Sequence, residues 1–215
     1  MDPAGFVRHN TAVTATPLVP EIRLHLATEI TPIWQATEDT LARTGLPPPF
    51  WAFAWAGGQA LARYLLDHPA EVAGRSVLDF GAGSGLVAIA AAKAGAASVL
   101  AAEIDDFAAA AIAANASLNN VEVAVQTTDL LDTVDPRWEI VTAGDVCYER
   151  PMADRVTSWL GGLAYRGVIV LLGDPGRAYL PDKGLTERAR YLVPTSREIE
   201  DRDNRETIVW QVMPG

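Results

Sequence analysis

Three glycines stand at alternate positions, Gly81, Gly83 and Gly85, between a short apolar run and an alanine-rich segment. The apolar run, residues 76–79, has the composition of a buried strand, and residues 86–94 form a segment long enough for a helix. Glycine lets the backbone turn tightly, and the first turn of a helix offers unpaired N–H groups. The pattern therefore predicts a strand, a ligand-binding loop and a helix in immediate succession.

Beyond this loop, short apolar runs alternate with longer amphipathic segments. Strands are predicted at residues 76–79, 98–102, 121–126, 139–143 and 167–172, and helices at residues 86–94, 106–119 and 151–163. The alternation is typical of βαβ units and predicts an α/β fold with a mostly parallel sheet. Residues 191–193 and 207–212 are joined by a charged turn without a helix, which predicts an antiparallel hairpin at the end of the chain.

The first 75 residues differ in composition from the rest. Prolines interrupt short apolar repeats in residues 1–50, which predicts an N-terminal helical extension packed on the core. Residues 51–75 are expected to form one helix after an aromatic entry. We therefore expect two units, the extension at 1–50 and a single α/β domain at 51–215.

Composition excludes several classes of function. The net charge of −10 repels duplex nucleic acid, and no local basic patch counters it. The single cysteine, Cys147, excludes an internal disulfide, and the three histidines lack metal-ligand spacing, so we expect no metal and a reducing compartment. The N-terminus lacks the pattern of a secretory signal, and the longest uncharged stretch, residues 44–62, contains three consecutive prolines. We expect a cytoplasmic monomer that does not bind membranes.

An acidic residue, Glu103, follows the second predicted strand, where a carboxylate can accept hydrogen bonds from both hydroxyls of a ribose. Together with the glycine loop it indicates a nucleoside-containing ligand. The dinucleotide fingerprint would need glycine at position 86, which is Leu86, and a nucleophile elbow would need glycine there and at Ala82. A phosphate P-loop would need a Gly-Lys-Ser or Gly-Lys-Thr ending. The remaining alternative is a glycine turn that binds no ligand.

The run Asp79-Phe80-Gly81-Ala82-Gly83-Ser84-Gly85, with Glu103 downstream and the terminal hairpin, resembles the seven-β-strand, class I methyltransferases that use S-adenosylmethionine. The resemblance implies a Rossmann-like seven-stranded sheet and a cofactor that leaves as S-adenosylhomocysteine. It also implies that Asp79 and the three glycines belong to the cofactor site, with the glycines against the methionine part and Glu103 on the ribose. Asp129 would accept a hydrogen bond from the adenine amino group, and a helix or turn cap is the alternative role for Asp129.

A second group of polar residues follows the fourth predicted strand, in Gly144-Asp145-Val146-Cys147-Tyr148-Glu149. The carboxylate of Asp145 and the phenol of Tyr148 can face one small space, where the cofactor and an acceptor amine would meet. A lysine amine, with a pKa of about 10.4, must lose a proton before it attacks, and Asp145 can accept it. We expect Asp145 and Tyr148 to be catalytic, with Asp145 also near the cofactor. The alternatives are a turn cap for Asp145 and a packed ring for Tyr148.

Aromatic residues precede a glycine pair upstream of the glycine loop. Trp51 and Trp55 stand before Gly57 and Gly58, and glycine allows another group to approach the backbone closely. A tryptophan face also attracts a sulfonium or ammonium group. We expect Trp55 and Gly57 at the cofactor, and Trp51 with Tyr148 at the substrate, the alternative being that the tryptophans belong to the core.

Four segments together are similar to the protein-lysine methyltransferases of the D-x-x-Y family, above all to those that modify the β subunit of the electron transfer flavoprotein. They are residues 18–24 with Pro32-Ile33-Trp34, residues 48–65, Asp145-Val146-Cys147-Tyr148, and Gly173-Asp174-Pro175-Gly176-Arg177. The resemblance implies methyl transfer to an exposed lysine in a basic segment of a protein, with that β subunit as the expected partner. A methyltransferase for small molecules or for a ribosomal protein is the alternative. An idle cofactor-binding module would have lost the glycine loop, Glu103 or Asp145, and all of these are present.

Overall fold

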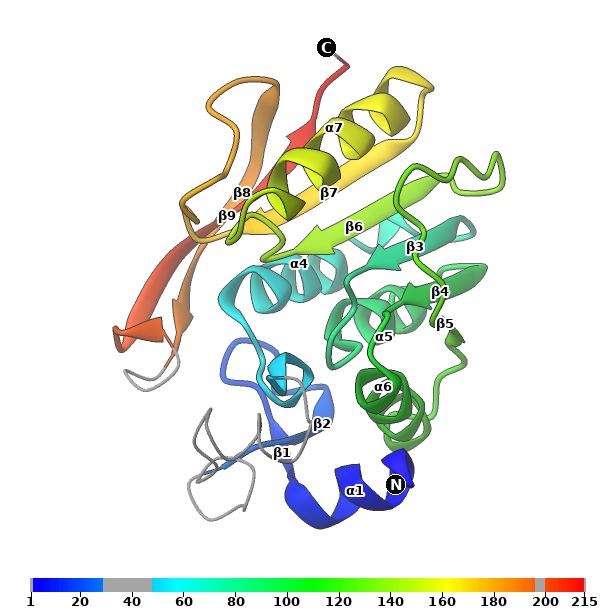
Figure 1. Ribbon diagram of the computed structural model, residues 1–215, viewed down its shortest axis with the longest axis vertical. Coiled ribbons are helices and arrows are strands. Elements are labelled where there is room, and N and C mark those ends of the chain that lie inside the picture. Colours follow the sequence, from blue (N-terminus) through cyan, green and yellow to red (C-terminus); the bar gives the residue numbers. More distant parts are fainter. Residues whose placement is uncertain (1, 29–47, 196–199, 215) are drawn as a thin grey trace.

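A seven-stranded sheet of order β5-β4-β3-β6-β7-β9-β8 runs through the centre of the protein (Figure 1). The computed structural model describes residues 2–28, 48–195 and 200–214. The strands are β3 (Ser76–Phe80), β4 (Ser98–Ala102), β5 (Ala124–Gln126), β6 (Ile140–Gly144), β7 (Ile169–Asp174), β8 (Leu185–Pro194) and β9 (Asn204–Val212). The first five are parallel, and β9 is antiparallel to both β7 and β8. The predicted mostly parallel sheet with a terminal hairpin is confirmed.

The strand order reverses beside β3, which pairs with β4 on one side and β6 on the other. In open α/β sheets, ligands bind beyond the carboxyl ends of the strands at such a reversal. The glycine loop leaves β3 at this point, Glu103 follows β4, and Asp145 follows β6. The topology therefore brings together residues that are far apart in the sequence.

Helices cover both faces of the sheet unequally. One face carries α4 (Ala56–Asp67), α5 (Leu86–Lys93) and α6 (Asp106–Leu118), and the other carries α7 (Met152–Tyr165). Helix α5 is buried from Leu86 to Ala91, because its apolar side chains, several of them alanines, fit between α4, α6 and the sheet. On the α7 face, Trp159 of α7 and Trp138, which precedes β6, belong to the cluster that packs against the sheet. None of the described helices is both long and apolar enough to cross a bilayer.

The single helix expected over residues 51–75 is wrong in its bounds. The region contains a 3-10 helix (Phe50–Ala52), then α4, then a second 3-10 helix (Pro69–Glu71). Helix α4 ends before Pro69 because proline has no N–H to donate and disfavours the helical conformation in the residue before it. The strand predicted at 121–126 is likewise shorter, since β5 begins at Ala124.

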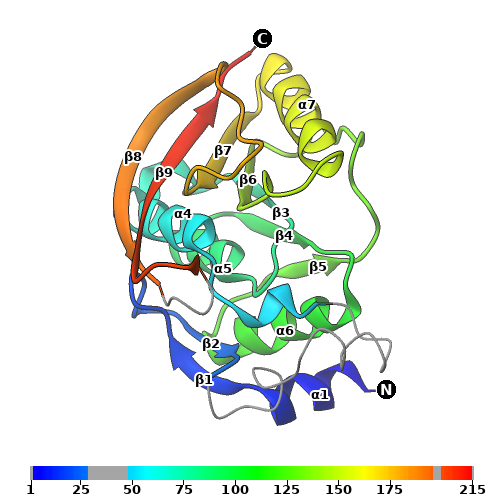
Figure 2. The same cartoon turned by 60° about the vertical axis from the view of Figure 1, so that its left-hand side comes forward.

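The N-terminal region contains strands as well as a helix. After α1 (Pro3–Asn10), β1 (Ala12–Ala15) and β2 (Arg23–Leu26) form an antiparallel hairpin, where only helices were expected. Figure 2 shows this hairpin and α1 next to α6. Pro32-Ile33-Trp34, part of the family resemblance, lies outside the described residues.

The C-terminal hairpin is much longer than the expected 191–193 and 207–212, and it curves along one edge of the molecule in Figure 2. Its outer strand β8 carries charged side chains, so the sequence there lacks the apolar pattern from which a strand is predicted. Arg190 pairs there with Glu187 and Glu206. Charged residues on an edge strand oppose pairing with another chain.

Candidate active site

A cavity of about 480 Å³ opens at the carboxyl ends of the parallel strands. It is large enough for a cofactor-sized ligand. Residues predicted from sequence that line it are Trp51, Trp55, Gly81, Gly83, Glu103, Asp129, Asp145 and Tyr148. Residues that sequence reasoning did not assign to a site also line it, among them Phe50, Ile104, Asp105, Met152 and Arg177.

The glycine loop forms the cavity wall beyond β3. Gly81 and Gly83 have φ angles of 64° and 51°, a backbone conformation that residues other than glycine rarely adopt. The Gly83 amide donates a hydrogen bond of 3.0 Å to Oε2 of Glu103, so the loop and the acidic residue after β4 hold each other in place. Sequence reasoning predicted both groups, and the structure brings them into direct contact.

The two carboxylates expected on the nucleoside both lie in the cavity wall. Glu103 also accepts a 3.3 Å hydrogen bond from the Asp105 amide, and burial raises the pKa of its carboxyl although these amide bonds lower it. Asp129 is exposed, and its Oδ1 accepts from the Leu131 amide at 2.9 Å. Asp129 is thus a turn cap, the alternative stated above, while it also lines the cavity.

Asp79 does not line the cavity. Its carboxylate is buried beneath the loop, where it accepts from the Ala88 amide at 3.0 Å and from the Thr142 hydroxyl at 2.9 Å. Burial raises the pKa of Asp79 to about 7. In this structure Asp79 ties β3 to α5 and β6 and supports the loop from behind, and its contact with a cofactor stays a prediction.

Gly57 and Gly85 also lie outside the cavity wall. Gly57 packs directly against the Gly173 carbonyl of β7, where a Cβ atom would collide with the oxygen. Gly85 precedes α5 with φ of 78°, and a Cβ atom there would come within 3.1 Å of Ile112. Both glycines permit close packing between elements, and their expected contact with a cofactor stays a prediction.

Asp145 lies at the centre of a charged group. Asp145 has a backbone φ of 56° and is 8% exposed, and its Oδ2 accepts a hydrogen bond from the Gly58 amide at 3.1 Å. Its Oδ1 accepts from Nη2 of Arg177 at 2.6 Å and from Nε at 3.1 Å. Burial raises the pKa of Asp145 to about 6, and the charge of Arg177 opposes that rise.

Aromatic rings surround the opening next to Asp145. Tyr148 is 51% exposed and its ring centroid lies 6.0 Å from that of Phe50, which lies 6.1 Å from Trp55. The indole of Trp55 donates a 2.8 Å hydrogen bond to the Phe50 carbonyl. Trp51 is buried, so it combines the core role and the cavity role that the sequence left open.

Arg177 and Glu200 are the main charged residues that sequence reasoning missed. Arg177 follows the carboxyl end of β7 in a Gly-Asp-Pro-Gly-Arg run, and that position at the site-forming edge was the available signal. Glu200 precedes β9 within a charged stretch and carried no comparable signal. Within the described parts of the chain, no group of three His, Cys, Asp or Glu could hold a metal ion.

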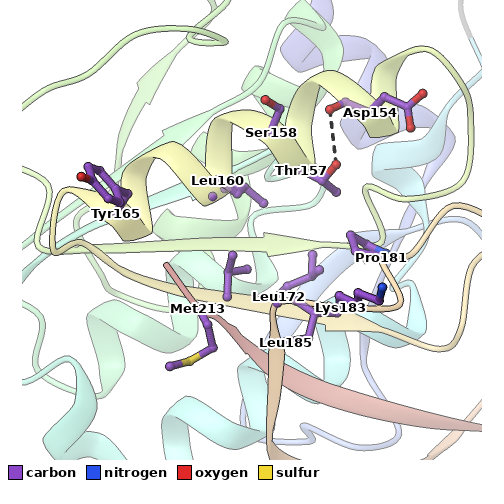
Figure 3. Close-up of a pocket in the computed structure, with 13 residues that line it drawn as sticks. Asp154, Thr157, Ser158, Leu160, Tyr165, Leu172, Pro181, Lys183, Leu185 and Met213 are labelled. Atoms are coloured by element: carbon purple, nitrogen blue, oxygen red, sulfur yellow. Dashed lines mark hydrogen bonds between the residues drawn. The ribbon is translucent and has the colours of Figure 1, made fainter. Parts of the chain in front are cut away.

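A second cavity, of about 540 Å³, lies between α7 and the strands β7, β8 and β9 (Figure 3). Its wall is mostly apolar, with Leu160, Leu172 and Leu185 pointing toward it. None of the site residues predicted from the sequence lines it. The candidate active site is therefore the cavity at the strand ends.

Comparisons with known proteins agree with this geometry. The family model "Ribosomal protein L11 methyltransferase (PrmA)" matches residues 60–144. Magnesium protoporphyrin IX methyltransferase (ChlM) from Synechocystis PCC 6803 with bound SAM has 18% identity and a TM-score of 0.54, covering 87% of this chain and 100% of that one, which shows the class I methyltransferase fold. The electron transfer flavoprotein beta subunit lysine methyltransferase of Xenopus laevis is 37% identical over 99% of this chain and 87% of its own length. The Mus musculus protein of that name is 36% identical over 98% of this chain and 84% of its length. With such identity over nearly its whole length, the chain belongs to the electron transfer flavoprotein beta subunit lysine methyltransferase family.

Proposed function

We propose that this protein transfers methyl groups from S-adenosylmethionine to a lysine side chain of the electron transfer flavoprotein β subunit. The observation that carries the proposal is the meeting of the glycine loop, Glu103 and Asp145 on one cavity. Family membership supports the reaction type and the acceptor. We further propose that the reaction takes place in the cytoplasm, which cell fractionation tests.

The residues of the cavity fit the cofactor. Gly81 and Gly83 offer close backbone approach, and Glu103 keeps lone pairs free for ribose hydroxyls after its two amide bonds. Four carboxylates line the cavity, from Glu103, Asp105, Asp129 and Asp145, against the single guanidinium of Arg177. This balance suits a positively charged sulfonium. When bound, S-adenosylmethionine supplies an electrophilic methyl group.

The acceptor lysine would enter past the exposed rings of Phe50 and Tyr148. Aromatic faces stabilise an ammonium group by about 0.5–2 kcal/mol and exclude water from it. Asp145 would accept a hydrogen bond from the amine, which orients the nitrogen, and its carboxylate would take up the proton that the amine loses. This chain thus supplies orientation and a proton acceptor.

The PrmA match makes methylation of ribosomal protein L11 a second candidate function. That match covers residues 60–144, which include the glycine loop and Glu103 but end before Asp145 and the hairpin. The cofactor half of the site therefore fits both functions equally well. The acceptor assay below includes both proteins so that it separates them.

The test incubates purified protein and S-adenosylmethionine with the flavoprotein β subunit or with ribosomal protein L11, and locates methylated lysines by mass spectrometry. We expect methylation of the β subunit. Methylation of L11 alone would establish the second candidate, and methylation of neither would contradict both proposals.

Two variants separate the roles of the carboxylates. Asp145→Ala should abolish methyl transfer but leave the affinity for S-adenosylhomocysteine within about twofold, because its work is on the amine. Glu103→Ala should weaken that affinity by about 1.5–3 kcal/mol, through lost charge-assisted hydrogen bonds. Calorimetry measures both, with Glu122→Ala, an exposed residue away from the cavity, as control. Equal loss of affinity in both site variants would refute this division of roles.

A further inference from the structure

We infer that Arg177 is a positioning residue for methyl transfer: it holds the Asp145 carboxylate charged and in a fixed orientation in the cavity wall, and Glu200, which precedes β9, anchors Arg177. The inference rests on the proposed function, because Asp145 is the proposed acceptor of the amine hydrogen bond. It extends the acceptor site to a hairpin turn that the sequence did not connect with it.

The guanidinium of Arg177 lies between two carboxylates. It donates two hydrogen bonds to Oδ1 of Asp145, at 2.6 and 3.1 Å. It donates two more to Glu200, from Nη1 to Oε2 at 2.9 Å and from Nη2 to Oε1 at 2.7 Å. Glu200 is 2% exposed, so this pair is largely withdrawn from solvent. Paired hydrogen bonds on each side fix the direction of the planar group.

The backbone at Arg177 is fixed as well. Oδ1 of Asp174 accepts from the Gly176 amide and the Arg177 amide, both at 2.7 Å. On its other side the guanidinium carbon lies 5.7 Å from the ring centroid of Trp55. The side chain thus lies in a defined place before any substrate arrives, so its ordering is not left to the binding step.

Asp145 retains one free acceptor position. A carboxylate offers about four lone-pair positions. Two on Oδ1 are used by Arg177, and one on Oδ2 is used by the Gly58 amide. The remaining position on Oδ2 belongs to a carboxylate that lines the cavity. Arg177 and the Gly58 amide therefore leave Asp145 one acceptor position, and we assign that position to the amine.

The charges that face Asp145 come from several elements. Arg177 favours its ionised form, whereas Asp174 and Glu200 oppose it, and Arg205 partly balances Glu200 with a 3.3 Å contact. Oδ2 of Asp174 is buried and has no hydrogen-bond partner among the described residues. The neighbouring Cys147 thiol has a raised pKa of about 12 and stays neutral, and α4 contributes only the Gly58 amide. Without Arg177, three buried carboxylates would face one another.

These charges give variants of opposite sign. Arg177→Gln removes the favourable charge, so the acidic limb of kcat/KM against pH should move to higher pH by about 1 to 3 units. Glu200→Gln removes an opposing charge and keeps one acceptor for Arg177, so the limb should move to lower pH. Arg177→Lys keeps the positive charge but loses the paired hydrogen bonds of the planar guanidinium. The acidic limb of kcat/KM should therefore stay near its wild-type pH while kcat falls. Arg190→Gln, on the exposed edge strand, is the control and should shift nothing.

A spectroscopic readout separates this inference from the proposed function. The ¹³Cγ resonance of Asp145, assigned by its loss in Asp145→Asn, reports the carboxyl titration in the full chain without any methyl transfer. We expect the midpoint to move upward in Arg177→Gln and downward in Glu200→Gln. Coincident titrations in wild type and Arg177→Gln would overturn the inference, even where wild type methylates lysine. If Arg177→Gln does not fold, a Glu200→Gln midpoint that is unchanged or higher overturns it. Absence of lysine methylation by wild type would overturn the proposed function, whatever the titration midpoint of Asp145.

Discussion

At the scale of single residues, Asp79 has a structural role beneath the glycine loop. The motif implied a cofactor contact, but both carboxylate oxygens bond within the protein, to the Ala88 amide and the Thr142 hydroxyl. Burial is the larger effect on its charge, because two hydrogen bonds do not replace the lost water. The free energy of unfolding should therefore depend on pH through the ionisation of Asp79.

Asp79→Asn tests this coupling. The folded-state pKa of about 7 lies above the ordinary value of about 3.9, so the group's stabilising contribution is complete below pH 4 and is lost as pH rises through 7. In the variant that loss is absent. The excess in unfolding free energy of wild type over the variant should therefore fall by about 2–3 kcal/mol between pH 5 and pH 8 in urea titrations. Asp182→Asn, an exposed control, should show no such change. A constant excess for Asp79→Asn would contradict the assignment.

At the scale of elements, the adjacent glycines at the start of α4 differ sharply in surroundings. Gly57 packs on β7 so closely that a Cβ atom would overlap the Gly173 carbonyl and come within 2.5 Å of Oδ2 of Asp145. Gly58 has only a Val87 methyl at 4.0 Å. The helix approaches the sheet along one line of contact, and Gly57 lies on it.

Gly57→Ala and Gly58→Ala form a matched pair. The first should lower the free energy of unfolding by about 2 kcal/mol or more, because backbone atoms must move apart. The second should be neutral or stabilise the protein by up to about 1 kcal/mol, because alanine favours helix. Thermal unfolding measures both. Equal effects of the two substitutions would show that the close approach of α4 to β7 does not carry the difference.

The C-terminal end of α6 holds the N-terminal hairpin through two asparagines four residues apart, Asn115 within the helix and Asn119 at its C-cap. Asn119 accepts from the Arg23 amide at 3.2 Å and donates to the Arg23 carbonyl at 2.6 Å. Asn115 accepts from the His25 amide at 2.7 Å and donates to the Ser84 carbonyl at 2.8 Å. Asn115 alone of this pair therefore links the hairpin to the glycine loop.

Substitution of each asparagine by alanine separates the two effects. Both variants should lose about 1–3 kcal/mol of unfolding free energy, because buried backbone groups lose their partners. Asn115→Ala should also weaken binding of S-adenosylhomocysteine, since the loop loses its support, whereas Asn119→Ala should leave that affinity unchanged. Calorimetry decides the matter, and a loss of affinity that is equal in both would remove the special role of Asn115.

At the scale of the whole molecule, the net charge of −10 and the acidic lining of the cavity act in the same direction. Both raise the local concentration of a basic protein segment and oppose nucleic acid. Exposed apolar residues at the cavity, such as Phe50 and Tyr148, add contact area once the partner arrives. Long-range charge would then govern the rate at which the two proteins meet, and the exposed rings of Phe50 and Tyr148 would contribute to the contact between them.

Methylation of the β subunit should slow as salt rises, at saturating cofactor and subsaturating acceptor. The Debye length falls from about 30 Å at 0.01 M to about 8 Å at 0.15 M, which screens attraction between surfaces. Initial rates at these two ionic strengths test the effect. Calorimetry of S-adenosylhomocysteine at the same salts checks that cofactor binding is not the cause. A rate independent of salt would contradict electrostatic steering.

The sequence by itself determined the order of strands and helices and the placing of Glu103 and Asp145 at one edge. Apolar runs and glycine spacing are local signals, and parallel strands always bring their carboxyl ends to one side. The same logic predicted the glycine loop beside Glu103, and the 3.0 Å bond from Gly83 bears it out. The full length of β8 and the β1–β2 hairpin were not predicted, because charged or very short strands show little hydrophobic periodicity.

Only the tertiary structure decided which residues do what within that frame. Gly57 and Gly58 are the same residue type in the sequence, yet a Cβ atom at Gly57 would collide with a backbone carbonyl and one at Gly58 would meet only a Val87 methyl at 4.0 Å. Asp79 belongs to the cofactor motif, yet its carboxylate is turned inward. Arg177 reaches Asp145 and Glu200 only because the residues after β6, those after β7 and Glu200 before β9 come together in the folded chain. Hydrogen bonds and charge pairs act over a few ångströms, so such roles depend on distances that exist only once the sheet has assembled.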